Sequence, residues 1–324
     1  MLWAGPRPGP QEEQLAAIYL GSAQRPSPRP LEKKGVMRDM GKLEGRVAFI
    51  TGAARGQGRS HAVKLAAEGA DIIAVDICET FDSMNYPLAT PEDLEQTVKD
   101  VEELDRRIVA GRGDVRVKSE LKAVLDAGLA EFGRLDIVVA NAGVTATKNP
   151  TTAQAFIDGV DVDLGGVMNT VGVAMPHLTE GASIIVTGST AGMIKGLVDS
   201  PAAGPGGAGY AWAKRTIASY VEVLGLQLAP HMIRINAIHP TNTNSDLLHN
   251  EDIYRAFRPD LEHPTREDAM LAFPAMQAMP IPYIEPGDVS NLVAFLASDD
   301  SRYMTGLNIR LDAGAMLKGG MSFG

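Results

Sequence analysis

The sequence lacks the features that mark several large classes of protein. Its 324 residues contain one cysteine, which excludes a disulfide within the chain, and no apolar run of the ~18 or more residues that a transmembrane helix requires. Basic residues form no block, and the net charge of −10 opposes electrostatic binding to nucleic acid or to an anionic membrane. We therefore expect a soluble, cytoplasmic protein whose ligand is a small molecule.

Metal and thiol chemistry also have little support. The histidines His231, His239, His249 and His263 occur without the His-x-x-x-His or cysteine-paired spacing of a metal site, so we expect no metal. They are better interpreted as pocket-lining or surface residues. Nothing in the sequence marks Cys78 as a low-pKa thiol, although a redox-active role is an alternative.

The first 40 residues differ in composition from the rest. They contain six prolines, among Gly, Gln and Arg, and only one short apolar patch at 15–20. The sequence predicts a disordered extension over 1–40 and a single catalytic domain over 41–324. Met37 and Met40 directly precede the first regular pattern, so an upstream start assignment would account for the extension. A targeting peptide is a weaker alternative, because Glu12, Glu13 and the prolines interrupt the required amphipathic helix.

From residue 46 the apolar pattern alternates between strand and helix periods. Such alternation predicts an α/β fold with a Rossmann-type, doubly wound parallel sheet. After 238 the alternation stops, and 240–284 is a long segment that we interpret as a lid over the substrate. The expected strands are 46–51, 71–76, 108–114, 135–140, 183–188, 232–238 and 307–311, and the expected helices are 57–68, 92–108, 116–132, 152–178, 208–229 and 287–297.

A glycine-rich turn follows the first expected strand. Gly52 suits a tight turn, Gly56 lets backbone approach a pyrophosphate, and Gly58 lets the next helix pack closely on the strand. The second strand ends at Asp76, where a carboxylate can accept hydrogen bonds from an adenosine ribose and repel a 2′-phosphate. This pattern favours NAD over NADP. A solvated aspartate at a strand end is the alternative.

Tyr210 and Lys214 stand four residues apart, so both side chains leave the same face of a helix. A cation beside a phenol favours tyrosinate, which would make Tyr210 an acid or base at neutral pH. The spacing alone is weak evidence, and the alternative for Lys214 is a surface ion on an amphipathic helix.

Together these motifs resemble, in order, those of the short-chain dehydrogenase/reductase family, over roughly residues 43–318. The resemblance implies a nicotinamide cofactor, NAD, bound at the ends of the strands. It also implies that Lys214 binds the nicotinamide ribose. The cofactor-binding residues that it implies are Gly52, Arg55, Gly56, Gln57, Gly58, Asp76, Asp114, Val115, Asn141, Ala142, Gly143, Tyr210, Lys214, Pro240, Thr241 and Thr243. As an ordinary turn residue, Asn141 would need no further role.

The resemblance gives a candidate catalytic set of Ser189, Tyr210, Lys214 and Asp163. Ser189 would hold the substrate oxygen, although an isolated serine commonly only closes a turn. It precedes Tyr210 by more than the usual family spacing, so 193–207 is interpreted as an inserted loop.

Two positions depart from the family pattern. Asp163 occupies a position where many members have an asparagine that passes protons onward from the lysine. Its role is open, and a solvent-facing helix residue or a turn cap is the alternative. Pro240 is kept but the usual glycine after it is replaced by Thr241, so nicotinamide contacts there are only suggested.

The segment 77–93 and the run from His239 to Asn242 resemble the mycofactocin-associated, carveol-dehydrogenase-like subgroup. That resemblance implies a lipophilic secondary alcohol and its ketone as substrates, a mycofactocin-type redox partner and a homotetramer. The segment 77–93 would cover bound NAD and trap it, or else form an ordinary surface loop.

The lid contains Met270, Phe273, Met276 and Met279 at a spacing of three, which predicts a helical apolar edge that packs in the core or lines a lipophilic pocket. A 3-oxoacyl or steroid ketone reductase is the enzyme alternative. A nucleotide-bound scaffold is the non-enzyme alternative, and the intact Tyr210 and Lys214 count against it.

Overall fold

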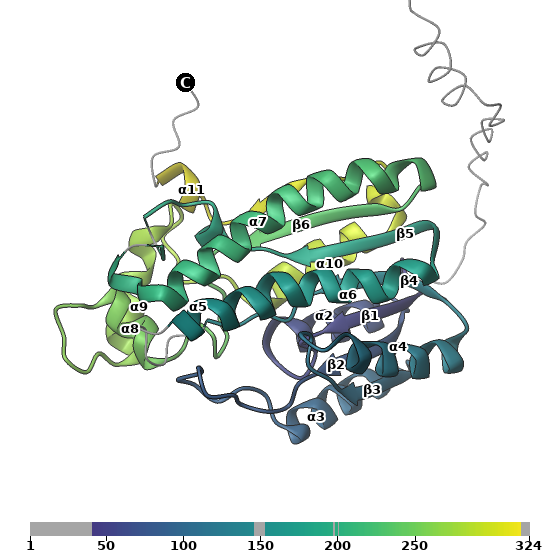
Figure 1. Cartoon of the computed structure of the whole chain (residues 1–324), viewed down its shortest axis with the longest axis horizontal. Coiled ribbons are helices and arrows are strands. Elements are labelled where there is room, and N and C mark those ends of the chain that lie inside the picture. The colour runs from purple at the N-terminus through teal and green to yellow at the C-terminus, as the bar shows by residue number, and fades with distance from the viewer. Residues whose placement is uncertain (1–40, 146–152, 197, 200, 319–324) are drawn as a thin grey trace, which may run out of the picture. The chain divides into compact units, whose positions relative to one another are not determined.

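The computed structural model describes residues 41–145, 153–196, 198–199 and 201–318, which are built on one parallel sheet of seven strands (Figure 1). The strand order is β3-β2-β1-β4-β5-β6-β7. This is the predicted doubly wound Rossmann-type sheet, and the prediction is confirmed. The strands are β1 (Val47–Thr51), β2 (Asp71–Asp76), β3 (Ile108–Arg112), β4 (Leu135–Ala140), β5 (Leu178–Thr187), β6 (Arg234–Pro240) and β7 (Asn308–Leu311).

The central strands are continuous apolar runs, which is typical of strands covered on both faces. Phe49 in β1 is fully buried and is paired in register with Ile73 of β2 and Val138 of β4. Strand order reverses between β1 and β4. In open α/β sheets a ligand binds outside the carboxyl ends of the strands at this reversal, so the topology positions a site there.

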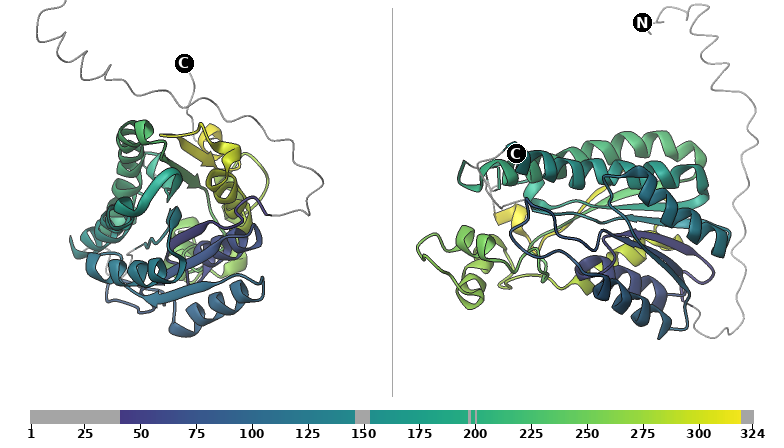
Figure 2. Two further views of the ribbon diagram at one scale, coloured as in Figure 1. Left: turned by 90° about the vertical axis from the view of Figure 1, so that its right-hand side faces the viewer. Right: turned by 60° about the horizontal axis from the view of Figure 1, so that its bottom comes forward.

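Two layers of helices cover the sheet (Figure 2). Helices α4, α6 and α7 enclose one apolar cluster, and α2, α3 and α10 enclose the other. The helices are α2 (Gly56–Ala67), α3 (Pro91–Glu102), α4 (Lys118–Phe132), α5 (Ala153–Val160), α6 (Gly166–Ala174), α7 (Gly204–Leu228), α8 (Glu251–Phe257), α9 (Arg266–Ala272), α10 (Pro286–Ala297) and α11 (Ala315–Lys318). Within the described residues, no helix combines the length and the apolar character needed to cross a bilayer.

The helices on either side of the site differ from their predicted bounds. The helix expected over 152–178 is interrupted by a π-helical turn at Asp161–Gly165, and its last turn, Met175–His177, is a 3₁₀ helix that leads into β5. Helix α7 begins at Gly204 rather than 208, because Pro205 suits a first helical turn, where a backbone N–H is not needed. The segment interpreted as an inserted loop over 193–207 is therefore shorter than predicted.

The long segment after β6 contains α8 and α9 and extends beyond the carboxyl ends of the strands (Figures 1 and 2). The predicted apolar edge of this lid is wrong as a single helix, since α9 ends at Ala272 and a 3₁₀ turn, Phe273–Met276, follows. Phe273 is fully buried, whereas Met279 is 59% exposed. The predicted extension over 1–40 lies outside the described residues.

Candidate active site

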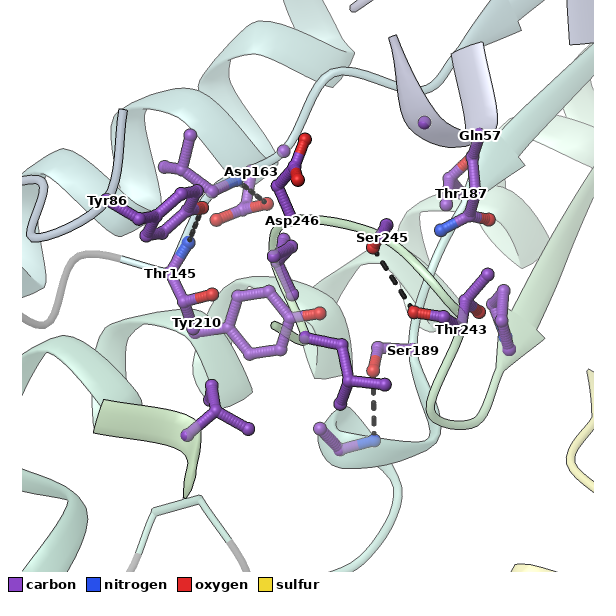
Figure 3. A pocket seen from close by; sticks show the side chains of 18 of the residues that line it. Gln57, Tyr86, Thr145, Asp163, Thr187, Ser189, Tyr210, Thr243, Ser245 and Asp246 are labelled. Atoms are coloured by element: carbon purple, nitrogen blue, oxygen red, sulfur yellow. Dashed lines mark hydrogen bonds between the residues drawn. The ribbon is translucent and has the colours of Figure 1, made fainter. Parts of the chain in front are cut away.

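A cavity of about 1030 Å³ lies at the carboxyl ends of the strands, between the sheet and the lid. Every candidate cofactor-binding and catalytic residue lines it, although these residues come from segments between Gly52 and Thr243 that are far apart in the chain. Figure 3 shows part of its wall, with the side chains of Tyr210 and Ser189 directed into the same space.

The glycine turn between β1 and α2 requires glycine at its ends. A Cβ on Gly58 would lie 1.9 Å from the carbonyl oxygen of Gly52, so the turn closes only without one. Gly56 has a φ of +55°, a left-handed conformation that favours glycine. A Cβ there would meet nothing closer than Ser245 Cβ at 3.7 Å, which leaves the backbone of the turn open to the cavity.

Asp76, at the end of β2, lies beside this turn. Its Oδ2 accepts from the backbone N–H of Ala54 at 3.0 Å, and its Oδ1 accepts from that of Cys78 at 3.2 Å. Burial raises the pKa of Asp76, while those N–H groups and the Arg55 charge oppose the rise. Each carboxylate oxygen keeps a lone pair with which to accept from a ligand hydroxyl.

Asn141 uses its side chain to join three strands. Its Nδ2 donates to the carbonyl oxygen of Thr51 at 3.1 Å, and its Oδ1 accepts from Thr187 Oγ1 at 3.2 Å. The Asn141 amide thus has a structural role, and Asn141 lines the cavity together with Ala142 and Gly143.

Lys214 is held in a fully enclosed position on α7. Its Nζ donates to the carbonyl oxygen of Thr187 at 3.0 Å and lies 3.1 Å from Asp163 Oδ1 and 5.7 Å from the centre of the Tyr210 ring. Burial raises the pKa of Tyr210, and the charge of Asp163 raises it further, whereas the Ser189 hydroxyl opposes the rise. These surroundings favour the protonated phenol of Tyr210 in this structure.

Ser189 is positioned by His239, which the sequence predicted only to line the pocket or lie at the surface. The backbone N–H of Ser189 donates to His239 Nδ1 at 3.2 Å, and His239 Nε2 lies 2.9 Å from Asn308 Oδ1. Because Nδ1 accepts, the ring carries its proton on Nε2, which donates to Asn308. His239 packs so closely under the serine loop that a Cβ on Gly188 would lie 2.4 Å from Nδ1.

The segment after β2 and the lid meet over the cavity. The Arg55 side chain donates to the carbonyl oxygen of Pro87 at 2.5 Å and pairs with Asp246 of the lid at 3.1 Å. Asn85 donates to Asp252 of α8. Tyr86 from the same segment is buried, and its hydroxyl accepts from the backbone N–H of Thr145 at 3.4 Å (Figure 3).

The lid contributes many apolar side chains to the cavity, together with the charged Asp246, Asp252 and Arg255. Within the described residues no group of three or more His, Cys, Asp or Glu side chains is placed to hold a metal ion. The apolar side chains are contributed mainly by the lid and by the segment before α7, and they include Val144, Val198, Leu247, Leu248, Ile253, Phe257, Pro259 and Met276.

Comparison with known proteins agrees with this geometry. Residues 52–316 match the family model described as enoyl-(acyl carrier protein) reductase. A putative short-chain type dehydrogenase/reductase of Mycolicibacterium smegmatis is 48% identical over 86% of this chain and 99% of its own. The (-)-trans-carveol dehydrogenase of Rhodococcus erythropolis is 45% identical over 86% of this chain and 100% of its own.

A solved structure is similarly close. The carveol dehydrogenase of Mycobacterium avium, crystallised in complex with NAD, superposes with a TM-score of 0.79 at 43% identity, over 86% of this chain and 99% of that one. The chain belongs to the short-chain dehydrogenase/reductase family and is an oxidoreductase of that family. The resemblance to the carveol-dehydrogenase-like members is thereby confirmed.

Proposed function

We propose that this protein is an NAD-dependent dehydrogenase that interconverts a lipophilic secondary alcohol and its ketone. One observation carries the proposal. Tyr210, Lys214 and Ser189 meet where the polar part of the cavity, beside the glycine turn and Asp76, joins the apolar part beneath the lid. A reacting carbon placed there has an acid or base on one side and an apolar enclosure on the other.

NAD is the cofactor that the polar part fits. Several buried polar atoms in this part of the cavity have no hydrogen-bond partner among the described residues: Gln57 Oε1, Thr241 Oγ1 and Asn242 Nδ2. Buried polar groups are normally paired, so such atoms point to a polar ligand. The open backbone at Gly56 suits a pyrophosphate, and Asp76 suits an unphosphorylated ribose. Two solved relatives hold NAD, the carveol dehydrogenase of Mycobacterium avium and a short chain dehydrogenase of Mycobacterium paratuberculosis.

The bound dinucleotide supplies a hydride acceptor or donor. In ketone reduction the protonated Tyr210 donates its hydroxyl proton to the carbonyl oxygen, and in alcohol oxidation tyrosinate takes the hydroxyl proton. Ser189 holds the same oxygen in place. Lys214 stabilises the anionic form of Tyr210 and hydrogen-bonds the nicotinamide ribose.

The many apolar side chains that the lid adds to the cavity support a lipophilic substrate, because a charged substrate would lose its hydration against them. The carveol dehydrogenases among the relatives support the same class. The remaining expectations are proposals as well: a mycofactocin-type electron acceptor, a cytoplasmic location and a homotetramer. Exposed apolar side chains on α6 and α7, including Met168, Trp212 and Leu226, support self-association.

The proposal is tested by releasing the cofactor from the purified protein by denaturation and identifying it by mass spectrometry. A panel of secondary terpene alcohols, steroid ketones and 3-oxoacyl thioesters is then assayed with and without an artificial electron acceptor. Recovery of NAD and turnover of the terpene alcohols are expected. Turnover of the thioesters or the steroid ketones alone would show that the proposed substrate class is wrong. Absence of NAD-linked turnover with every compound in the panel would contradict the proposal.

A further inference from the structure

Asp163 lies in an unusual turn of the backbone. The π-helical turn Asp161–Gly165 interrupts the helical segment between β4 and β5, and π-turns of this kind occur frequently at functional sites. Asp161 is exposed at the start of the turn, whereas Asp163, two residues later, is completely buried. The turn therefore directs one carboxyl into the protein and leaves a second one in solvent.

The buried carboxyl is joined to the catalytic lysine without an intervening group. Asp163 Oδ1 lies 3.1 Å from Lys214 Nζ and accepts from the backbone N–H of Val144 at 3.3 Å. Its Oδ2 is buried with no hydrogen-bond partner among the described residues. A Cβ on Gly143 would lie 2.6 Å from Oδ1 and 3.2 Å from Nζ, so glycine at this position makes room for the pair.

The ionisable groups around this pair come from four elements. Lys214 and Tyr210 face Asp163 from α7, and Tyr86 faces it from the segment after β2. His239, on β6, faces Lys214. Arg55, at the start of α2, acts on Tyr86. Among these groups Lys214 is the only cation in contact with Asp163, so the ionised carboxylate cancels the charge that would otherwise stabilise tyrosinate.

We propose that Asp163 is a positioning residue that acts on Tyr210 through the charge of Lys214, so that the protonation state of Asp163 sets which form of Tyr210 is available. This inference rests on the proposed function. With Asp163 ionised, Tyr210 keeps its proton and is ready to donate it to a ketone. With the proton on Asp163, the charge of Lys214 acts on Tyr210 alone and tyrosinate is available to take a proton from an alcohol.

Protons balance in both directions. In ketone reduction the proton that Tyr210 gives to the carbonyl oxygen is replaced from water, and in alcohol oxidation the proton that tyrosinate takes from the hydroxyl leaves to water before the next cycle. The proton on Asp163 is bound and released separately, and Oδ2, which has no hydrogen-bond partner among the described residues, is the oxygen that can carry it. Burial raises the pKa of Asp163 to about 6, which keeps the protonated carboxyl accessible near neutral pH.

An asparagine at this position has neither the charge nor the proton-accepting oxygen. Asp163→Asn therefore leaves Lys214 uncompensated, and the pH at which Tyr210 ionises falls by about one unit or more. A shift of one unit increases the tyrosinate fraction about tenfold at a pH well below the pKa. The ratio of alcohol oxidation to ketone reduction at neutral pH is expected to increase by a similar factor.

The test is a pH titration of tyrosinate absorbance on the purified protein with its cofactor as isolated. The Tyr210 contribution is obtained by subtracting the titration of Tyr210→Phe. Asp163→Asn is compared with wild type and with Asp161→Asn, which removes an exposed carboxyl from the same turn. Asp163→Ser, which also removes the charge, is used if the asparagine variant is insoluble. A lower ionisation pH in the Asp163 variant only is expected.

An unchanged or higher ionisation pH in the Asp163 variant overturns the inference, as does an equal shift in Asp161→Asn. Because the titration does not require turnover, it tests the effect of Asp163 on Tyr210 independently of the proposed function. If turnover depends on Tyr210 but the titration is unchanged, the coupling between Asp163 and Tyr210 is wrong and the proposed function stands. If the titration shifts but no alcohol or ketone reacts, the coupling stands and the proposed function fails.

Discussion

The Arg55 guanidinium lies 3.1 Å from the Asp246 carboxylate, and this pair joins the glycine turn after β1 to the lid after β6. The same guanidinium donates to Pro87 in the segment that follows β2. Asn85 of that segment donates to Asp252 of α8. Three parts of the chain are thus connected over the polar end of the cavity, as expected if bound NAD leaves slowly.

We expect isotopically labelled NAD to exchange slowly into the dialysed protein, and faster into the double variant Asp246→Asn/Asp252→Asn. A partly exposed ion pair contributes ~0.2–1 kcal/mol, so loss of the Arg55–Asp246 pair alone corresponds to an increase of about 1.4- to 5-fold, and loss of the second contact adds to it. Asp260→Asn, on the lid surface and paired with Arg258, serves as the control. Rapid exchange in wild type, or steady turnover with free NAD alone, would show that the cofactor is not trapped.

Replacement of Asp76 separates its two expected roles. Asp76→Ala removes a ribose acceptor and a repulsive charge, and loss of hydrogen bonds to a charged group costs ~1.5–3 kcal/mol, or about a tenfold to hundredfold weaker affinity for NAD. Asp76→Asn removes the charge and one of the two acceptor oxygens but keeps the other, so it narrows the preference for NAD over NADP with a smaller loss of NAD affinity than Asp76→Ala. Titration of both nucleotides into the apoprotein measures each effect, and unchanged affinities would restore the interpretation as a solvated strand-end residue.

The buried His61 is expected to make the free energy of unfolding depend on pH below neutrality. Burial lowers its pKa to about 3, so the folded protein binds fewer protons than the unfolded chain between that value and ~6.5. The stability that neutral His61 provides is complete above ~6.5 and is lost as pH falls, by at most ~1.4 kcal/mol per unit. Urea unfolding of His61→Asn is expected to show a flatter acid limb than wild type or the exposed variant His263→Asn. Parallel limbs in all three proteins would contradict this.

Deletion of residues 1–36 is expected to leave melting temperature and turnover unchanged. The buried apolar clusters of the described residues begin at Leu43, and a proline-rich stretch with little apolar surface has little to add to them. Differential scanning calorimetry of the full and shortened proteins measures the difference. A large loss of soluble protein on deletion would show that the segment packs or assembles.

Local sequence patterns were enough to predict where several residues of the site lie. Apolar strands followed by Gly52, Asp76 and Ser189 place these residues at one edge of a parallel sheet, and the four-residue spacing places Tyr210 and Lys214 on one helix face. These signals are contained within short windows of sequence.

Contacts between distant segments were not predictable in the same way. His239 reaches the Ser189 backbone from 50 residues away, and Asn85 reaches Asp252 from 167 residues away. Such pairs depend on how the lid and strands pack, which no local period encodes. The π-turn that buries Asp163 inserts one residue into a helical repeat, so a regular 3.6-residue pattern does not position that carboxyl correctly.

The central claim is that Tyr210 transfers the proton in an NAD-linked alcohol and ketone reaction. Tyr210→Phe removes only the phenolic hydroxyl from a partly buried ring, so the fold and NAD affinity are expected to be kept. Acid–base catalysis contributes ~10²–10⁴-fold, and the most direct measurement is kcat of Tyr210→Phe with its best alcohol beside the NAD content of the same preparation. A loss of that order with NAD content unchanged is expected, and wild-type turnover in the phenylalanine variant would contradict the role of Tyr210.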